Sequence, residues 1–448
     1  MKNTNWSPGS WKSYPVEQAV EYPDREALDD SLARLFQAPP LVTSWEVETL
    51  RSQLADACVG RRFLLQGGDC CEKFRDCRPE PIANKLKILL QMSFVLVHGS
   101  GMNVIRVGRF AGQYAKPRSS ETEKRDGRTL PSYRGDLVNR PEFTPEARRP
   151  DPVNLLRGHE RSAMTLNFIR SLVQGGFADL HHPEQWDLGF VEKARQAEEY
   201  RKTIRAVEDA IGFLETIAGR PLSELTGVDF FTSHEGLCLP YEEAHTRQVP
   251  RRTGWYDLST HFPWIGNRTR NLDGAHVEFF RGIANPVGVK IGPGAKPAEI
   301  LELADILNPL NEPGRLVFIH RFGAGRVESC LVPLVEEMRR KKKAVLWCCD
   351  PMHGNTVTAN GGIKTRSFDL ILGELEESFR VHREIDSHLG GIHFELTGDD
   401  VTECTGGSGG LTEDDLATAY ESDVDPRLNY QQAFEMALKV AGLMKDGK

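Results

Sequence analysis

Short apolar runs alternate with helical patterns along most of this chain. Eight runs end in polar or glycine-rich residues: FLLQGGDC from Phe63, MNVIRVGRF from Met102, GVDFFTSHE from Gly227, YDLSTHFPWIG from Tyr256, PVGVKIGP from Pro286, RLVFIHRFG from Arg315, AVLWCCD from Ala344 and GGIHFELTG from Gly390. Apolar residues recur at helical spacing between several of them, as in NKLKILLQMSFVLV, AEILELADIL, ESCLVPLVEEMRR and FDLILGELEESFRVHREI. Strands that alternate with helices predict a parallel sheet, and eight of them favour a closed (β/α)8 TIM barrel over an open doubly wound sheet.

Two further regions carry helical patterns that a barrel does not need. Residues 1–60 precede the first strand and contain REALDDSLARLFQ and SWEVETLRSQLADA, whose apolar faces need partners. The stretch from about 144 to 227, between the second and third strands, contains the amphipathic NLLRGHERSAMTLNFIRSLV. We therefore expect an N-terminal helical extension over 1–60 and a catalytic barrel over 61–448 that includes this helical insertion. Such helices can cover the barrel, form a subunit interface or hold a small-molecule site.

The ends of the predicted strands carry reactive side chains. In (β/α)8 barrels the chemistry takes place at the C-terminal ends of the strands. The residues at or just past these ends are Cys70, Arg109, Glu235, Trp264, Arg268, Lys290, Arg321, His353 and Glu395. One group is cationic and another has the chemistry of metal ligands. The sequence thus predicts a divalent metal beside a pocket for phosphate and carboxylate groups.

Two of these residues carry more weight than the others. Glu395 lies inside an otherwise apolar strand, where a carboxylate needs a charged partner or a metal. Lys290 lies in VGVKIGP, where burial is expected on both faces, so we expect its ammonium group to face an anion. Taken alone, Cys70 is more often a small buried hydrophobe and His353 an exposed turn residue. Their positions at strand ends favour the functional interpretation.

Composition and charge narrow the class of protein. Hydrophobic residues make up 39% of the 448 residues and charged residues 27%, which is ordinary for a globular protein. The net charge of -8 argues against general binding to nucleic acid or membranes but permits a local basic pocket. No stretch approaches 18 apolar residues, and the nine cysteines form no CxxC motif. We expect a soluble cytoplasmic protein in a reducing compartment, with loops at SSETEKRDGRTLPS and TGGSGG.

Nine motifs in chain order resemble those of a known enzyme family. They are QGGDC, GQYAKPRS, YRGDLVN, SHEGL, WIGNRTRNLDGAH, NPVGVKIGP, CDPMHGNT, FELTGDDVTEC and DPRLNYQQ. From about Leu64 to Leu443 the chain resembles the class II, plant-type 3-deoxy-D-arabino-heptulosonate 7-phosphate (DAHP) synthases. The resemblance implies condensation of phosphoenolpyruvate with erythrose 4-phosphate, the first step of the shikimate pathway. It also implies frequent oligomers under feedback control by aromatic metabolites, so we expect a homo-oligomer.

The resemblance also implies roles for individual residues. The implied metal ligands are Cys70, His353, Glu395 and Asp425, the last in a loop after the final strand. The implied phosphoenolpyruvate site consists of Arg109, Arg268, Lys290 and Arg321, lined by Trp264 and Glu235. The implied erythrose 4-phosphate site is formed by Lys116, Arg118 and Ser119 of KPRS. Lys290, Arg321, Glu235 and His353 are the expected catalytic residues. One departure is a second cysteine, Cys71, and the family register favours Cys70 as the ligand.

The expected ligand set and the intact motifs decide between the remaining alternatives. Mixed sulfur, nitrogen and oxygen ligands suit Mn²⁺, Co²⁺, Fe²⁺ or Zn²⁺ better than Mg²⁺ or Ca²⁺, and we expect Mn²⁺ or Co²⁺ first. A related synthase of secondary metabolism would take an amino sugar phosphate and would alter the aldehyde end of the site, but KPRS is intact. A catalytically dead barrel with a regulatory role would lack at least one ligand, and all four are present.

Overall fold

The computed structural model describes residues 6–175, 177 and 228–445 of the chain. Eight parallel strands form one sheet in the order β5-β2-β1-β14-β11-β10-β9-β8. Their bounds are Arg62–Gly68 (β1), Asn103–Arg109 (β2), Phe231–Thr232 (β5), Trp264–Ile265 (β8), Val287–Ile291 (β9), Leu316–His320 (β10), Leu346–Cys349 (β11) and Leu389–Glu395 (β14). Six lie within the predicted runs, and β1 and β14 begin one residue before theirs, so the predicted strands are confirmed.

The two edge strands of this sheet are also joined to each other. Backbone hydrogen bonds run from Phe262 N to Thr232 O at 3.2 Å, from Trp264 N to His234 O at 3.1 Å and from Gly236 N to Trp264 O at 3.0 Å. These bonds link the end of β5 to β8, so the curled sheet meets itself. The strand count, the parallel order and this closure fit a (β/α)8 fold.

Successive side chains along each strand point alternately into the barrel and outward toward the helices, and both sides are apolar. The inward side chains form one core with residues of helix α2 (Ser44–Cys58): Leu50, Leu54, Ala57, Leu64, Ile105, Val107, Phe231, Phe262, Trp264, Val317, Ile319, Leu346 and Cys348. The predicted SWEVETLRSQLADA helix is therefore present, and its apolar face closes the N-terminal end of the sheet. A capping box starts it, since Glu46 N donates to Thr43 Oγ1 at 3.3 Å and Thr43 N donates to Glu46 Oε2 at 2.8 Å.

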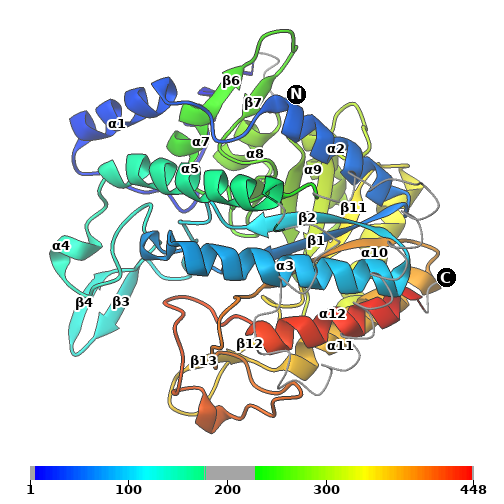
Figure 1. The fold of residues 1–448 in the computed structure, drawn as a ribbon. Helices are drawn as coiled ribbons and strands as arrows, with labels where there is room; N and C mark the ends of the chain where they lie inside the picture. Colours follow the sequence, from blue (N-terminus) through cyan, green and yellow to red (C-terminus); the bar gives the residue numbers. More distant parts are fainter. Residues whose placement is uncertain (1–5, 176, 178–227, 446–448) are drawn as a thin grey trace.

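The outward face of the sheet is covered by helices. They are α3 (Pro79–Ser100), α8 (Ala275–Phe280), α9 (Pro297–Leu307), α10 (Val327–Arg340), α11 (Phe368–Glu384) and α12 (Tyr430–Lys445). Figure 1 shows α3 and α12 side by side although the sequence separates them by most of its length. Proline in the first turn starts α3 and α9, where its missing N–H costs nothing. Among the described residues, no helix is long and apolar enough to cross a bilayer.

Helices outside the barrel follow the predicted patterns as far as the structure describes them. Helix α1 (Arg25–Gln37) is capped at its N-terminus by Asp24, whose side chain accepts from Ala27 N at 2.9 Å. Helix α5 (Val153–Gln174) contains the amphipathic pattern of the predicted insertion and packs near α1. The rest of that predicted insertion, 178–227, lies outside the described residues. Two short helices complete this part of the chain, α4 (Pro145–Arg148) and α7 (Leu239–His245).

The segment predicted as a loop at Ser119 to Ser132 is instead a β-hairpin. Strand β3 (Thr122–Arg125) pairs antiparallel with β4 (Arg128–Pro131). The turn residues Asp126 and Gly127 have φ of 48° and 75°. An Asp-Gly pair with both φ values positive makes the tight turn that joins antiparallel strands, which the loop prediction overlooked. Two more hairpins pair β6 (Thr246–Gln248) with β7 (Trp255–Asp257) and β12 (Thr356–Thr358) with β13 (Lys364–Arg366).

Candidate active site

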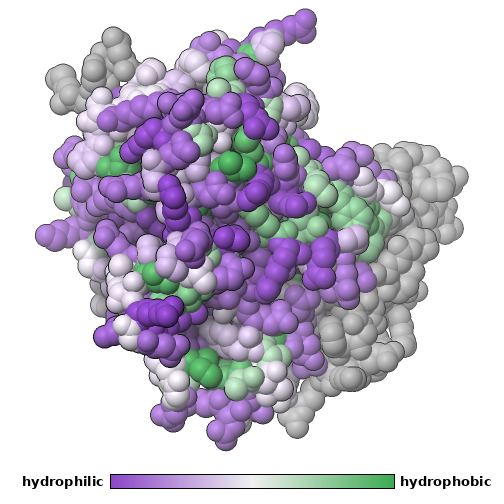
Figure 2. Space-filling model, turned by 90° about the vertical axis from the view of Figure 1, so that its left-hand side faces the viewer, coloured by the Kyte–Doolittle hydropathy of each residue, from purple (hydrophilic) through white to green (hydrophobic). Residues whose placement is uncertain are grey.

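A cavity of about 310 Å³ lies at the C-terminal ends of the strands. All of the site residues expected from the sequence line it: Cys70, Arg109, Lys116, Arg118, Ser119, Glu235, Trp264, Arg268, Lys290, Arg321, His353, Glu395 and Asp425. Figure 2 views the molecule from the side toward which β2 points in Figure 1, and hydrophilic residues cover most of that face. Residues from eight strands and their loops therefore meet in one place.

The register of three neighbouring strands explains why their last residues meet. Gly68 is level with Arg109 on β2 and with Glu395 on β14. A Cβ at Gly68 would lie 2.9 Å from Arg109 O, and its φ of +146° is unfavourable for other residues. Glycine at this position thus allows the close approach that places Cys70, two residues further on, beside the ends of β2 and β14.

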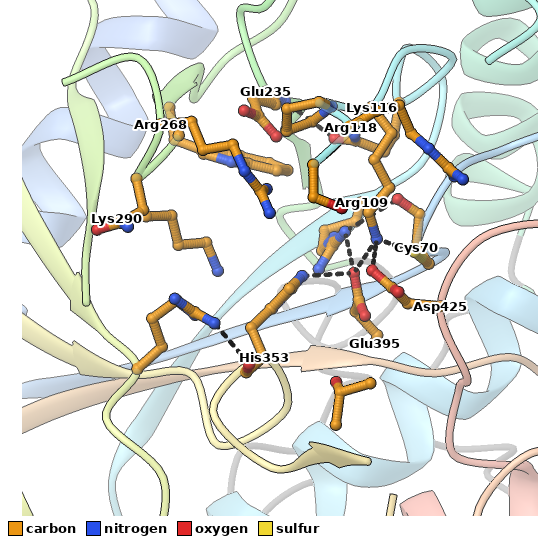
Figure 3. A pocket seen from close by; sticks show the side chains of 18 of the residues that line it. Cys70, Arg109, Lys116, Arg118, Glu235, Arg268, Lys290, His353, Glu395 and Asp425 are labelled. Carbon is orange, nitrogen blue, oxygen red and sulfur yellow. Dashed lines mark hydrogen bonds and ion pairs between the residues drawn. The ribbon is translucent and has the colours of Figure 1, made fainter. Parts of the chain in front are cut away.

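One side of the cavity gathers groups that bind metals. The ligand atoms of Cys70, Glu395 and Asp425 all lie within 4.8 Å of one another. His353 Nε2 lies 3.0 Å from Glu395 Oε1, so an imidazole joins the thiol and the two carboxylates. Figure 3 shows these four side chains converging from different segments of the chain. A set of sulfur, nitrogen and oxygen donors in this arrangement fits a divalent transition metal.

Lys116 lies among these donors. Its Nζ is 2.5 Å from Asp425 Oδ2 and 3.5 Å from Glu395 Oε1, and it contacts Cys70 Sγ. The sequence-based expectation placed this lysine at the erythrose 4-phosphate site, whereas here its ammonium group occupies the centre of the donor cluster. The position of one positive charge among these donors supports their fit to a cation. A metal bound there would take the place of the ammonium group.

Burial and charge act in opposite directions on the donors. Burial raises the pKa of the Cys70 thiol to about 12, and the Glu395 carboxylate adds to the rise. Burial also opposes ionisation of Glu395, but the charges of His353, Lys116 and neighbouring arginines outweigh it and hold the pKa of this carboxyl well below its usual range. The carboxylate is therefore ionised and the thiol keeps its proton, which a metal bound to the sulfur would displace.

The other side of the cavity is cationic. Arg268 and Lys290 lie on the side opposite Cys70 and Asp425 (Figure 3). The Trp264 ring lies between two of the cations, 5.3 Å from Arg109 Cζ and 5.9 Å from Lys290 Nζ. Burial lowers the pKa of Lys290 to about 8, even though Asp350 favours its charged form. These charges leave the cavity suited to an anion with both phosphate and carboxylate groups.

Arg109 and Arg321 connect the cationic side to the metal-binding side. Arg109 Nη2 donates to Glu395 Oε1 at 3.0 Å. Arg321 Nη2 donates to the backbone oxygen of His353 at 2.6 Å. A ligand held by these arginines would therefore lie directly beside the donors of the proposed metal. The two halves of the cavity form one continuous site.

Asp350 lies behind the site and was not among the site residues expected at the strand ends. It is fully buried and contacts Lys290 Nζ, while its Oδ2 lies 2.7 Å from His353 Nδ1. Its Oδ1 accepts from the backbone N–H groups of Met352 and His353 at 3.0 and 3.2 Å. A carboxylate on Nδ1 leaves Nε2 of the histidine free to face the other donors. The sequence signal was available in CDPMHGNT, where Asp350 directly follows strand β11.

The β12–β13 hairpin supplies two further cations. Lys364 Nζ lies 2.9 Å from Asp425 Oδ1, and Arg366 Nη1 lies 2.7 Å from Glu395 Oε2. Arg366 is fully buried. Both residues come from a hairpin in the segment after β11, away from the strand ends of the barrel, so their sequence positions do not mark them as site residues.

The two adjacent cysteines differ in their surroundings. Both cysteines belong to a small cluster with Tyr133 and Val424, but Cys70 also lines the cavity and Cys71 does not. The Cys71 Sγ lies 3.9 Å from Glu72 O. This geometry supports Cys70 as the donor, which the register of QGGDC also favours.

Glu235 is a buried carboxyl on the cavity wall. Burial raises its pKa, against the effect of the nearby charges of Lys116 and Lys290. Among the described residues its Oε1 has no hydrogen-bond partner. A Cβ at Gly266 would lie 2.1 Å from that atom, so only glycine leaves room for Glu235 in this position. A carboxyl with a raised pKa can hold or deliver a proton.

Comparison with known proteins identifies the family. Residues 6–441 match the model of the class-II DAHP synthetase family. The chain is 47% identical over 448 residues to phospho-2-dehydro-3-deoxyheptonate aldolase of Streptomyces coelicolor, covering 99% of each chain. It is also 47% identical over 452 residues to the protein of the same name from Neurospora crassa, covering 97% of this chain and 94% of the relative.

A solved structure supports the fold. The phospho-2-dehydro-3-deoxyheptonate aldolase of Francisella tularensis superposes with a TM-score of 0.52 at 12% identity, over 93% of this chain and 97% of the other. This similarity concerns the fold alone. The match to the family model and the two relatives together show that the chain belongs to the class-II DAHP synthetase family.

Proposed function

We propose that the strand-end cavity is the active site in which phosphoenolpyruvate and erythrose 4-phosphate are condensed to DAHP and inorganic phosphate, the first step of the shikimate pathway. Family membership over nearly the whole chain supports the reaction. One observation carries the assignment to this cavity, namely the cluster of cations beside a mixed set of metal donors. Cations can hold the anionic enol phosphate, and a bound metal can activate the aldehyde.

The cationic side is the proposed site of phosphoenolpyruvate. Its phosphate and carboxylate groups would be held by Arg109, Arg268, Lys290 and Arg321, with Trp264 and Glu235 lining the site. A guanidinium group can donate two parallel hydrogen bonds to two oxygens of a carboxylate or a phosphate. We assign the phosphate of erythrose 4-phosphate to Arg118 and Ser119 at the cavity rim, with Lys116 between that end and the metal donors.

Cys70, His353, Glu395 and Asp425 are the residues that would hold the divalent metal. When bound, the metal supplies Lewis acidity toward the aldehyde oxygen of erythrose 4-phosphate. Mn²⁺ or Co²⁺ suits these donors, with Fe²⁺ or Zn²⁺ as the alternatives.

The chain's own residues then do three things. The cations fix the enol phosphate so that its C3 faces the aldehyde carbon, and the new carbon–carbon bond forms there. Glu235, a buried carboxyl whose pKa is raised by burial, lines the cavity where it can exchange a proton with the oxygen that becomes a hydroxyl. Water adds at C2, the bond between C2 and the phosphate oxygen breaks, and Lys290 and the arginines neutralise the charge on the departing phosphate.

The two alternative functions predict different residues in the cavity. A synthase that takes an amino sugar phosphate would change the end where Lys116, Arg118 and Ser119 lie, and this motif is intact. A catalytically dead barrel would lack donors or cations, and every expected one lines the cavity. Both observations favour the condensation with erythrose 4-phosphate.

Release of phosphate tests the proposal. Purified protein supplied with phosphoenolpyruvate, erythrose 4-phosphate and Mn²⁺ or Co²⁺ should release one phosphate for each phosphoenolpyruvate consumed. Omission of the aldehyde, or addition of a chelator, should abolish release. Phosphate release with an amino sugar phosphate but not with erythrose 4-phosphate would instead favour the secondary-metabolism alternative.

We further propose that residues 1–60 form an extension to the barrel of 61–448 with its insertion, and that a cytoplasmic homo-oligomer forms through these helices. Several large apolar side chains on α1, α2 and α5 are exposed, including Phe36 (59%), Trp45 (70%) and Met164 (53%). Light scattering would contradict the oligomer if it gave a mass near 50.2 kDa. Assays with tryptophan, phenylalanine, tyrosine and chorismate, singly and in pairs, would test for feedback control.

A further inference from the structure

The loops that follow β10 and β11 touch each other and carry residues from both halves of the site. Arg321 opens the first loop and His353 lies in the second. A Cβ at Gly354 would lie 2.4 Å from Gly323 N, so the two backbones approach as closely as glycine permits. Gly323 also has φ of +89°. The position of either loop therefore depends on the other.

A single buried carboxylate lies behind both loops. Glu374, on α11, is fully buried. Its Oε1 accepts from the backbone N–H of Phe322, the residue after Arg321, at 2.7 Å. Its Oε2 accepts from Asn355 Nδ2, two residues after His353, at 2.7 Å. One side chain thus holds the backbone of the β10 loop and the side chain of the β11 loop.

Asn355 completes the connection. Its Oδ1 accepts from Ala324 N at 3.0 Å, and its Nδ2 also donates to Pro351 O at 2.8 Å. The bridge therefore reaches the first loop at two points, Phe322 and Ala324. It reaches the second loop on both sides of His353. Such contacts act on the backbone that carries the site residues, without touching the cavity.

A metal site is the other interpretation of this region. Ligand atoms of His320, Cys349 and Glu374 lie within 4.8 Å of one another. Both oxygens of Glu374, however, already accept strong hydrogen bonds from N–H groups. Cys349 Sγ lies 3.4 Å from Ser378 Oγ. The hydrogen bonds favour a role in positioning over one in metal ligation.

We propose that Glu374 is a positioning residue that fixes Arg321 and His353 relative to each other and thereby sets the affinity of the site for the phosphate of phosphoenolpyruvate. The proposal rests on the proposed function, because it takes Arg321 as a phosphate-binding residue. Glu374 itself touches neither substrate nor the reacting atoms. Its burial also raises its pKa to about 7, which marks the carboxylate as a costly group in this position.

Glu374→Gln tests the proposal, with Glu376→Gln as the matched control. The glutamine keeps the shape but can accept only one of the two bonds, while Glu376 is exposed on the same helix. We expect Glu374→Gln to raise the KM for phosphoenolpyruvate about tenfold, with the KM for erythrose 4-phosphate within about twofold of wild type. Calorimetric affinity for phosphoenolpyruvate should fall in parallel. Asn355→Ala, which cuts the other end of the bridge, should act in the same direction if Glu374→Gln fails to fold.

Three results would overturn the proposal. One is an unchanged KM for phosphoenolpyruvate in a folded Glu374→Gln variant whose melting temperature or kcat falls, since that is the effect of a merely structural residue. Another is an equal change in Glu376→Gln. The third is a second metal ion per wild-type chain that Glu374→Gln lacks. Wild-type protein without activity in the same series would remove the proposed function itself and this inference with it.

Discussion

The two ends of the barrel are built on the same strands but differ in the side chains that they bury. At the N-terminal end, Leu50 and Leu54 of α2 pack with inward strand residues such as Ile105, and all three are buried. At the C-terminal end, the same strands present buried charges such as Arg109 and Glu395. Apolar burial at the first end stabilises the fold. Buried charges at the second cost stability, and the ligand binding proposed for this end accounts for their presence.

Removal of a metal donor should give the largest effect at the charged end. Cys70→Ser replaces a thiolate with a hydroxyl, a poor ligand for a transition metal, so we expect metal affinity and activity to fall by at least the ~100-fold that loss of an outer-shell partner can cost. Metal titration followed by calorimetry checks the affinity. Cys71→Ser is the matched control and should stay within about threefold of wild type, because Cys71 lies outside the cavity lining. The opposite ranking of the two variants would move the ligand to Cys71.

Loss of a cation should have the next largest effect. Lys290→Met keeps the length of the side chain and removes its charge, so phosphoenolpyruvate binding should weaken by about 2 to 4 kcal/mol. Calorimetric titration with phosphoenolpyruvate measures this directly. Lys296→Met, at the start of α9 and outside the cavity lining, provides the control. Unchanged affinity in Lys290→Met would remove this lysine from the binding site.

The pH dependence of phosphoenolpyruvate binding should follow the ionisation of Lys290. Burial lowers the pKa of Lys290 to about 8, so its ammonium group is charged below that pH and loses its proton above it. Because the anion needs the charged form, affinity for phosphoenolpyruvate should be constant below pH 8 and fall by about tenfold per pH unit above it. Calorimetry from pH 6.5 to 9.5 would show the break. Lys290→Met should lack it, and an identical break in that variant would assign it to another group.

A small cavity at the apolar end should affect stability alone. Ile105→Val removes one methylene from the barrel core, and we expect a loss of about 1 kcal/mol of unfolding free energy. Thermal unfolding should shift down slightly, while the KM for each substrate stays at the wild-type value. A raised KM for phosphoenolpyruvate would show that the two ends of the barrel are less independent than their packing indicates.

The strands and much of the cavity lining were predictable from the sequence, because apolar runs, helical spacing and the polar residues at strand ends all indicate the same fold. The apolar runs predicted all eight strands, and the residues at their ends predicted nine residues of the cavity lining. The family resemblance alone supplied Asp425 and the KPRS residues Lys116, Arg118 and Ser119, since no strand end marks them. The β3–β4 hairpin was missed although Asp126-Gly127 is a known turn signal, because the flanking strands are short and polar.

The amino-acid sequence alone determined the order of strands and helices, the chemistry at each strand end and the family, because these depend on periodicity and on residue type. The tertiary structure decided which residues from separate elements come into contact. Lys116 lies among the metal donors, Asp350 bridges Lys290 and His353, and Glu374 connects two loops from a third element. Such contacts join residues from separate elements through side-chain directions and strand register, which no local pattern encodes.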